Sequence, residues 1–152
     1  MKLVVVSDSH RKIEVLNRIV AANPDADMFL HCGDIELSPD YFSQFIVVGG
    51  NNDYFGEYPD SKVISIETHK IFMTHSHQYL FHNRVDQLVE KAKRLGCDIV
   101  CFGHTHVFHY SQIEGIHVLN PGSCSYPRDM RGPCYAVIEI EGDSVIISRI
   151  SL

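Results

Sequence analysis

The chain has 152 residues and a formal net charge of −6, because 13 Lys and Arg residues face 19 Asp and Glu residues. Its composition is 45% hydrophobic and 21% charged, which is typical of a globular protein, and we expect a single domain over residues 1–152. An acidic chain gains nothing overall from counterion release along DNA or RNA, so we expect no nucleic acid as a stable partner.

The sequence also bears on location. No apolar run approaches the roughly 18 residues that suggest a membrane span, and the N-terminus turns polar at Ser7-Asp8, too early for a signal peptide. The five cysteines form an odd set without a C-x-x-C pair, which indicates free thiols rather than a disulfide framework. We therefore expect a cytoplasmic protein with no membrane partner.

Apolar runs alternate with helical patterns through the first half of the chain. A buried strand is predicted over residues 3–6, and a helix follows it from Ile13 to an end at Asn23-Pro24. Short strands over residues 28–30 and 45–48 each run into a glycine turn. Strands over residues 63–66 and 71–74 form a predicted hairpin.

The second half begins with a predicted helix over residues 83–95, with a cap signature at Asn83 and Asp86 and a stop at Gly96. A strand is predicted over 99–102, and residues 120–123 predict a turn. The other β-like segments of the last third cover residues 107–113, 117–119, 136–140 and 145–150. This order predicts an α/β sandwich, with either one mixed sheet or two stacked sheets flanked by helices.

Five of the predicted strands end in residues that can bind a metal ion. The segments are Asp8-Ser9-His10, Gly33-Asp34, Gly50-Asn51, His75-Ser76-His77 and His104-Thr105-His106. The carboxyl ends of parallel strands open onto a common crevice. An i, i+2 pair in extended backbone also points both side chains to the same side. We therefore expect these side chains to converge in one site.

The chemistry of this set favours two divalent ions. It offers two carboxylates, one amide and up to five imidazoles, which is more than a single zinc ion needs. Oxygen and nitrogen ligands without thiolate suit manganese, iron or zinc better than calcium or copper(I). Two dications facing two carboxylates leave a positive surplus, which favours a bound hydroxide and an anionic substrate such as a phosphate ester. A mononuclear zinc hydrolase acting on another ester stays open.

The motifs, in this order, resemble the calcineurin-like metallophosphoesterases, in particular their small bacterial and archaeal phosphodiesterase branch. The steps D-x-H, G-D, G-N, H-x-H and G-H-x-H are all present, and residues 120–123 and Pro127-Arg128 also match. The resemblance implies a four-layer α/β sandwich of two stacked mixed β-sheets flanked by helices. It implies a metal-dependent phosphodiesterase with a small phosphoester as substrate. The alternatives are a phosphomonoesterase of the same fold and a non-catalytic scaffold like the retromer sorting subunit.

The resemblance also implies roles for single residues. The ligands of the two metal ions are Asp8, His10 and His106 for one ion, and Asn51, His75 and His104 for the other. Asp34 bridges the ions, and a hydroxide between them attacks phosphorus. The implied cofactors are two divalent ions, Mn²⁺ ahead of Zn²⁺, Fe or Ni²⁺. The residues expected to act in catalysis are Asp34, Asn51, Asn52 and His77.

Asn52 departs from the family pattern, because many members have a histidine after the metal-binding asparagine. An amide cannot act as a general acid, so we expect a preference for activated diesters, or help from His77. The expected substrate contacts are Arg11, Asn52 and Arg128. We expect Arg84 and Arg131 on solvated faces.

The other notable side chains are assigned less specific roles. We expect His31 to pack in the core or to orient ligands rather than to bind metal. Tyr54, Phe55 and Tyr58 are interpreted as either a subunit contact or a shield for the site. Assembly into a homo-oligomer stays open.

Overall fold

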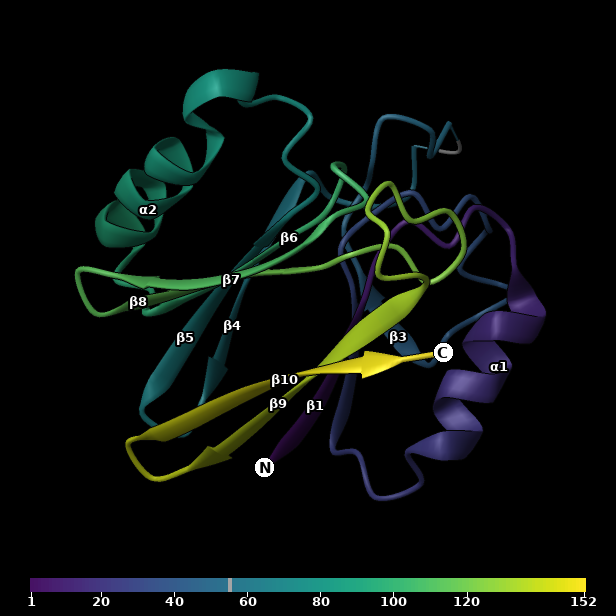
Figure 1. The fold of residues 1–152 in the computed structure, drawn as a ribbon, viewed down its shortest axis with the longest axis horizontal. Coiled ribbons are helices and arrows are strands. Elements are labelled where there is room, and N and C mark those ends of the chain that lie inside the picture. The colour runs from purple at the N-terminus through teal and green to yellow at the C-terminus, as the bar shows by residue number, and fades with distance from the viewer. Residues whose placement is uncertain (55) are drawn as a thin grey trace.

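The computed structural model describes residues 1–54 and 56–152, which include two five-stranded β-sheets (Figure 1). Phe55, one of the three aromatic residues interpreted above as a contact, lies outside the described residues. Tyr54 is exposed, whereas the hydroxyl of Tyr58 donates a hydrogen bond to the carbonyl of Leu37.

The first sheet has the strand order β10-β9-β1-β2-β3. Its strands are β1 (Lys2–Val6), β2 (Met28–His31), β3 (Phe45–Val47), β9 (Cys134–Glu141) and β10 (Ser144–Ser151). The second sheet has the order β4-β5-β6-β8-β7. Its strands are β4 (Ser61–Ile66), β5 (His69–Thr74), β6 (Ile99–Phe102), β7 (Phe108–Ile113) and β8 (Ile116–Pro121). Parallel and antiparallel pairs occur in both sheets, so both are mixed.

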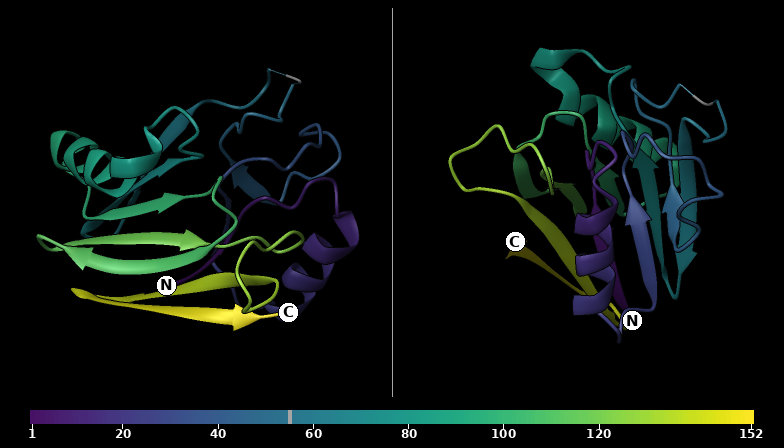
Figure 2. Two further views of the ribbon diagram at one scale, coloured as in Figure 1. Left: turned by 45° about the horizontal axis from the view of Figure 1, so that its top comes forward. Right: turned by 90° about the vertical axis from the view of Figure 1, so that its right-hand side faces the viewer.

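Helices cover the outer faces of the two sheets (Figures 1 and 2). Helix α1 (Ile13–Ala22) packs on the first sheet, and α2 (Arg84–Leu95) follows the short 3-10 helix η1 (Phe81–Asn83) and packs on the second. The predicted sandwich of two stacked mixed sheets flanked by helices is therefore confirmed. Within the described residues, we find no helix with the length and apolarity that a membrane span requires.

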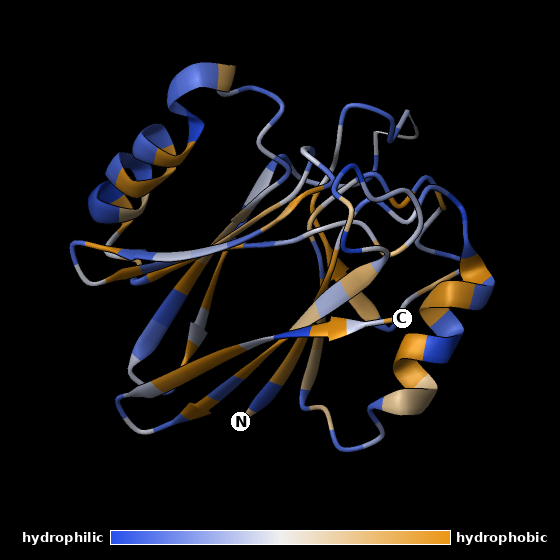
Figure 3. Ribbon diagram, viewed as in Figure 1, coloured by the Kyte–Doolittle hydropathy of each residue, from blue (hydrophilic) through white to orange (hydrophobic). Residues whose placement is uncertain are grey.

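Strand β1 shows why these sequences form this sandwich. Leu3 and Val5 point into the core between the two sheets, whereas Val4 and Val6 point into the core under α1. Because both faces of the strand are covered, the sequence is a continuous apolar run rather than an alternating one. Figure 3 shows hydrophobic residues along the strands between the two helices, and polar residues on the outer side of α2.

Three local predictions in the second half are wrong. Asn83 does not cap α2 with its side chain, because its Oδ1 accepts a hydrogen bond from Gln87 Nε2 instead. Asn120 and Pro121 belong to β8 rather than to a turn, because they pair with β7. Arg84 does not lie on a solvated face, since it is only 9% exposed in the first turn of α2.

Candidate metal centre

The residues predicted to bind metal follow strands whose carboxyl ends meet at one edge of the sandwich. Strands β1, β2 and β3 are parallel in the first sheet, and β5 and β6 are parallel in the second. The loops after these five strands carry the whole predicted ligand set, and we call this edge the metal edge. Its residues are Asp8, His10, Asp34, Asn51, His75, His104 and His106.

The first of two ligand groups joins Asp8, His10 and His106. Nε2 of His106 lies 3.2 Å from Asp8 Oδ1 and 3.3 Å from Nε2 of His10. These ligand atoms all lie within 4.8 Å of one another, so a single cation would contact all three. This is the set that the resemblance assigns to one metal ion.

The second group joins Asp8, Asp34 and His75. Nε2 of His75 lies 3.4 Å from Asp34 Oδ2 and 3.8 Å from Asp8 Oδ1. Asp34 Oδ2 is also 4.0 Å from Nε2 of His10 in the first group. Both carboxylates therefore lie between the two groups, whereas the sequence prediction gave this position to Asp34 alone.

Asn51 extends the second group. Its Oδ1 lies 3.1 Å from Nε2 of His75 and 3.1 Å from Nδ1 of His104. The three side chains that the resemblance assigns to the other metal ion thus face one another. Whether each side chain is a ligand stays a prediction.

The polar atoms of the site fit a cation. Asp8 Oδ1 is buried and has no hydrogen bond of good geometry among the described residues, which is costly for a carboxylate oxygen. Burial favours the neutral acid, but His106 and the positive charge of His75 outweigh it and hold the pKa of Asp8 below its usual value. A charged carboxylate with a free lone pair among imidazole nitrogens is suited to a divalent ion.

The histidines differ in how they bind protons. Burial favours the neutral form of His75, but the carboxylates of Asp34 and Asp8 outweigh it and raise the pKa of His75. The pKa of His106 is raised in the same way, against burial, by Asp8. Burial, His75 and Arg84 together lower the pKa of His104 to about 4. Cations that bind here therefore compete with protons at His75 and His106 but not at His104.

Comparison with known proteins decides the family. The family profile described as the calcineurin-like phosphoesterase superfamily domain matches residues 1–143. The chain belongs to this superfamily. A probable metallophosphoesterase from Bacillus subtilis (strain 168) is 32% identical over 150 residues, which are 97% of this chain and 89% of the relative. A phosphodiesterase from Methanocaldococcus jannaschii is 25% identical over 82% of this chain and 84% of its own length.

Solved structures agree with the calcineurin-like fold. A predicted phosphoesterase from Streptococcus pneumoniae superposes with a TM-score of 0.91 at 30% identity, covering 99% of this chain and 88% of the other. The protein Vps29 from Entamoeba histolytica, solved in complex with Zn²⁺, gives a TM-score of 0.76 at 23% identity, with 99% and 98% covered. At this identity, the similarity to Vps29 shows only that the two proteins share a fold. The prediction of a metallophosphoesterase is confirmed at the level of the family.

The backbone of this calcineurin-like site differs from the prediction. Asp8, His10, Asp34, His104 and His106 all have positive φ angles, between 45° and 73°. The expectation that each i, i+2 pair lies in extended backbone is therefore wrong for the Asp8–His10 pair and for the His104–His106 pair. Left-handed backbone is strained for these residue types and persists where surrounding contacts hold it, which is common at functional sites.

Backbone and carboxylate oxygens fix the rings of three histidines. Nδ1 of His75 bonds the carbonyl of Cys32 at 2.7 Å, and Nδ1 of His106 bonds the carbonyl of Tyr126 at 2.7 Å. Nδ1 of His10 bonds Glu36 Oε1 at 2.9 Å. In each ring, Nε2 is then directed at the ligand groups. Such partners orient metal ligands and raise their basicity.

Asp53 organises the loops that carry the ligands, and the sequence prediction missed it. Its carboxylate accepts hydrogen bonds from three backbone N–H groups, those of Asp34, Glu36 and Gly50, at 2.7 to 2.8 Å. Burial raises its pKa, although these donors favour the charged form. Glu36 was missed as well. The only sequence signal was the position of each acid two residues after a predicted ligand.

Asn52 contacts Asp34 through both of its donors. Its backbone N–H donates to Asp34 Oδ1 at 2.9 Å, and its Nδ2 donates to Asp34 Oδ2 at 2.8 Å. A Cβ atom on Gly50 would collide with the same carboxylate, so a glycine is required there. The residue predicted to act on substrate therefore positions Asp34 in this structure.

The remaining predicted substrate contacts surround the first ligand group. Arg128 is exposed and lines a cavity of about 620 Å³, together with His10 and His106. The side chain of Arg11 is largely exposed, and its Nε lies 3.5 Å from Glu36 Oε2. His77 is half-buried, with its ring centre 5.5 Å from that of His75, and its Nδ1 has no hydrogen bond among the described residues.

His31 is fully buried beneath the loops of the metal edge. Its Nε2 lies 2.9 Å from Ser9 Oγ, and its Nδ1 accepts a hydrogen bond from the N–H of Gly33. Burial lowers the pKa of His31 to about 3, so the ring is neutral. It joins the loops after β1 and β2, which is the packed, orienting position expected for it.

Proposed function

We propose that the chain is a metal-dependent phosphodiesterase with a dinuclear centre at the metal edge. The observation that carries the proposal is the pair of ligand groups that share the buried carboxylate of Asp8. Asp8, His10 and His106 would hold one cation, and Asn51, His75 and His104 the other, with Asp34 between them. We propose Mn²⁺ as the bound ion, as the family resemblance implies; the oxygen and nitrogen donors also suit Zn²⁺, Fe and Ni²⁺.

Divalent cations bound here would supply a hydroxide nucleophile at neutral pH and neutralise charge that develops on the phosphate. The protein's own part is to hold the ligands in place. Asn52 and Asp53 fix the carboxylate and backbone of Asp34, and Glu36 fixes the ring of His10. Arg128, at the rim of the 620 Å³ cavity, would attract the anionic ester.

The metal edge is least well equipped to protonate the leaving group, because it lacks a good general acid. The donors of Asn52 are engaged by Asp34, and an amide is not an acid. Burial and the charge of His75 lower the pKa of His77 below 6.5, so at neutral pH the ring is mostly neutral and rarely carries the proton that a general acid must donate. Diesters with good leaving groups should therefore be the best substrates, since general-acid help is typically worth about 10²–10⁴-fold.

The test compares bis-p-nitrophenyl phosphate with p-nitrophenyl phosphate on the Mn²⁺-loaded chain. We expect two ions per chain and a higher kcat/KM for the diester, as the name of the M. jannaschii relative also suggests. Preference for the monoester would establish the phosphomonoesterase alternative. A stoichiometry of one ion per chain would overturn the dinuclear centre and favour a mononuclear hydrolase.

A non-catalytic scaffold is the second candidate, because the Vps29 structure shares the fold. Against it, all seven predicted ligand positions carry metal-binding side chains that meet at one edge. A chain that neither binds metal nor hydrolyses either ester would be the scaffold.

We also propose a cytoplasmic location, a small phosphoester as the partner, and no stable complex with nucleic acid. All five cysteines are free and buried, which fits a reducing compartment. The acidic net charge of −6 opposes a general nucleic-acid surface. Assembly into a homo-oligomer would be decided by its mass in solution.

A further inference from the structure

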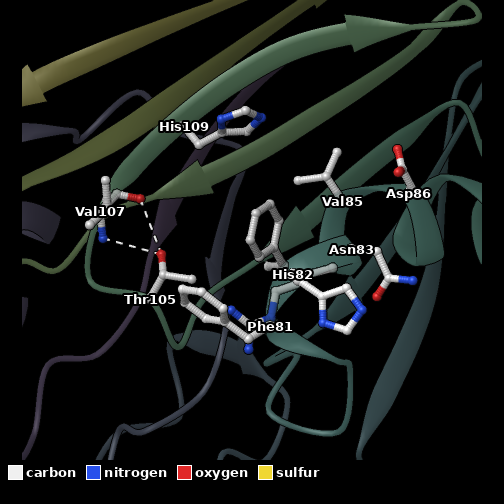
Figure 4. Close-up of a pocket in the computed structure, with 10 residues that line it drawn as sticks. Phe81, His82, Asn83, Val85, Asp86, Thr105, Val107 and His109 are labelled. Carbon is white, nitrogen blue, oxygen red and sulfur yellow. Dashed lines mark hydrogen bonds between the residues drawn. The ribbon is translucent and has the colours of Figure 1, made fainter.

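A second cavity lies between the start of α2 and the strands β6 and β7, and we call it the α2 pocket (Figure 4). Its volume is about 340 Å³, which is at the small end of ligand pockets, at roughly 300–1,000 Å³. The pocket is lined by Phe81, His82, Asn83, Arg84, Val85, Asp86, Phe102, Thr105, Val107 and His109. None of these residues belongs to the predicted metal ligands.

The walls of the α2 pocket suit a flat apolar ring. Phe81 is 87% exposed although it is a large apolar residue, and Phe102 closes the pocket from β6. Figure 4 shows the side chains of Val85, Val107 and His109 around the same space. Aromatic and aliphatic walls of this kind bind rings through stacking and burial of apolar surface.

Arg84 gives the pocket a buried hydrogen-bond donor without a partner. The residue is only 9% exposed, and its Nε has no hydrogen bond among the described residues. Among the described residues, its side chain makes one hydrogen bond, from Nη2 to the carbonyl of Tyr79, which is long at 3.5 Å. A buried guanidinium with a free donor is costly, so an acceptor atom on a ligand would be strongly favoured there.

The backbone of α2 adds to this preference. The helix has twelve residues and starts at Arg84, and the preceding Asn83 makes no side-chain cap. The first N–H groups of an α-helix have no partner within the helix and carry partial positive charge, and the residues at this end of α2 line the pocket. Asp86 also lines the pocket, and its carboxylate would repel a second phosphate. A neutral acceptor, such as a nitro or carbonyl oxygen on a ring, would pair with these donors without placing a second negative charge near Asp86.

Thr105 connects the α2 pocket with the metal edge. It lines the pocket and lies between His104 and His106 in the chain, one in each predicted ligand set. Its hydroxyl is held in place, because Oγ1 accepts a hydrogen bond from Asn120 Nδ2 at 2.9 Å. The wall of the pocket and the metal edge therefore share the loop that carries His104 and His106.

We infer that the α2 pocket binds one ester arm of the substrate, a flat ring that carries a neutral hydrogen-bond acceptor, and that Arg84 binds this acceptor. The inference rests on the proposed function, because it assumes a phosphoryl group at the metal edge. It narrows the substrates to aryl or heteroaryl esters and makes Phe81 and Arg84 determinants of specificity.

The test measures binding rather than turnover. Methylphosphonate, phenylphosphonate and 4-nitrophenylphosphonate share one anionic head and have no ester bond to hydrolyse. We titrate each into the Mn²⁺-loaded chain in a calorimeter. Phenylphosphonate should bind about tenfold more tightly than methylphosphonate, which is the scale of one aromatic contact. The 4-nitro compound should bind more tightly still.

Two variants assign the preference to residues. Phe81→Ala removes an exposed ring and should bring the phenyl-to-methyl ratio of affinities down to about threefold or less. Leu80→Ala is its control, because Leu80 is also exposed but does not line the pocket. Arg84→Gln should abolish the advantage of the nitro group and keep the phenyl-to-methyl ratio.

Each outcome bears on one claim. Equal affinities for the methyl and phenyl ligands in the unaltered chain would overturn the pocket. An unchanged nitro advantage in a folded Arg84→Gln chain would overturn the role of Arg84. If this variant does not fold, Phe81→Ala still tests the pocket. If the chain binds phenylphosphonate more tightly than methylphosphonate but hydrolyses no diester, the proposed function is refuted and the ring-binding role of the α2 pocket stands. If the chain hydrolyses diesters but binds the two phosphonates equally, only the ring-binding role of the α2 pocket is refuted.

Discussion

Two histidine–aspartate pairs lie at opposite ends of the sheets, and their surroundings differ. At the start of β5, His69 bonds Asp98 through Nδ1 and the carbonyl of Gly142 through Nε2, and Asp98 also accepts the N–H of Lys70. At the metal edge, His106 lies 3.2 Å from Asp8, but Asp8 Oδ1 has no hydrogen bond among the described residues.

The difference separates a structural pair from a binding site. In the His69–Asp98 pair the imidazole and the carboxylate have their partners, and the pair joins β5 to the β9–β10 hairpin. At the metal edge, further imidazoles converge on an oxygen that is already buried. Buried polar groups that lack a hydrogen-bond partner in the folded protein indicate a site where a ligand supplies the missing partner.

An aspartate-to-asparagine change in each of the two regions should separate their roles. Asp34→Asn removes one charge between the ligand groups, and we expect diester hydrolysis to fall by about 10³-fold, with loss of bound metal. Asp98→Asn is the same chemical change outside the site, and it should keep full activity and metal content. Rates and metal content of both variants check this. Unchanged hydrolysis in Asp34→Asn would refute the dinuclear centre.

A second change tests the groups that hold the ligands. Glu36→Gln keeps an acceptor near Nδ1 of His10 but removes the negative charge. We expect Mn²⁺ affinity to fall by about 10-fold, the low end of the range for such partners. Glu141→Gln, on the exposed end of β9, is the control and should change nothing. Equal Mn²⁺ affinity in the two variants would mean that Glu36 does not support the site.

The pH dependence of metal binding follows from the two raised histidines. Asp34 and Asp8 raise the pKa of His75, against burial, and Asp8 raises that of His106, both from 6.5. A cation must displace these protons, so its affinity should increase as the pH rises through the raised pKa values and then level off. Titrations with Mn²⁺ between about pH 6 and 9 would show this. Affinity that levels off below pH 6.5 would contradict the assignment.

Much of the fold and of the site could be predicted from local sequence. The apolar run of β1 predicted a strand covered on both faces, and the acids and histidines after five strands predicted one common edge. These inferences need only the period of a strand and the rule that parallel strands end together. The structure places all seven predicted ligands at that edge.

Other features depend on contacts between distant segments. The left-handed backbone of Asp8 and His104 is held by neighbouring loops, as when Asp8 Oδ2 accepts the N–H of His104. Asp53 supports Asp34 across 19 positions of sequence. Arginine usually lies on the surface, but Arg84 is only 9% exposed and its Nη2 contacts the carbonyl of Tyr79. No local pattern contains these contacts, so sequence reasoning missed them.

The His69–Asp98 pair should make a small contribution to the stability of the fold, and this contribution should depend on pH. The hydrogen bond with Asp98 raises the pKa of His69 above 6.5. Burial favours the neutral acid of Asp98. The hydrogen bonds from the backbone N–H of Lys70 and from the His69 ring outweigh this effect and lower the pKa of Asp98 below 3.8. The contribution of His69 is complete below pH 6.5 and is lost as the pH rises through its raised pKa. That of Asp98 is complete above pH 3.8 and is lost as the pH falls through its lowered pKa.

The pair should therefore stabilise the fold most between pH 3.8 and 6.5. Because the side chain of Asp98 is 41% exposed, we expect about 1 kcal/mol or less, or about 2–4 °C in Tm. The measurement is the Tm difference between the unaltered chain and Asp98→Asn from well below pH 3.8 to well above pH 6.5, in metal-free buffer so that the metal edge does not contribute; the difference should be largest between these two values and shrink on both sides. A difference that stays constant with pH would show that the pair acts through packing rather than charge.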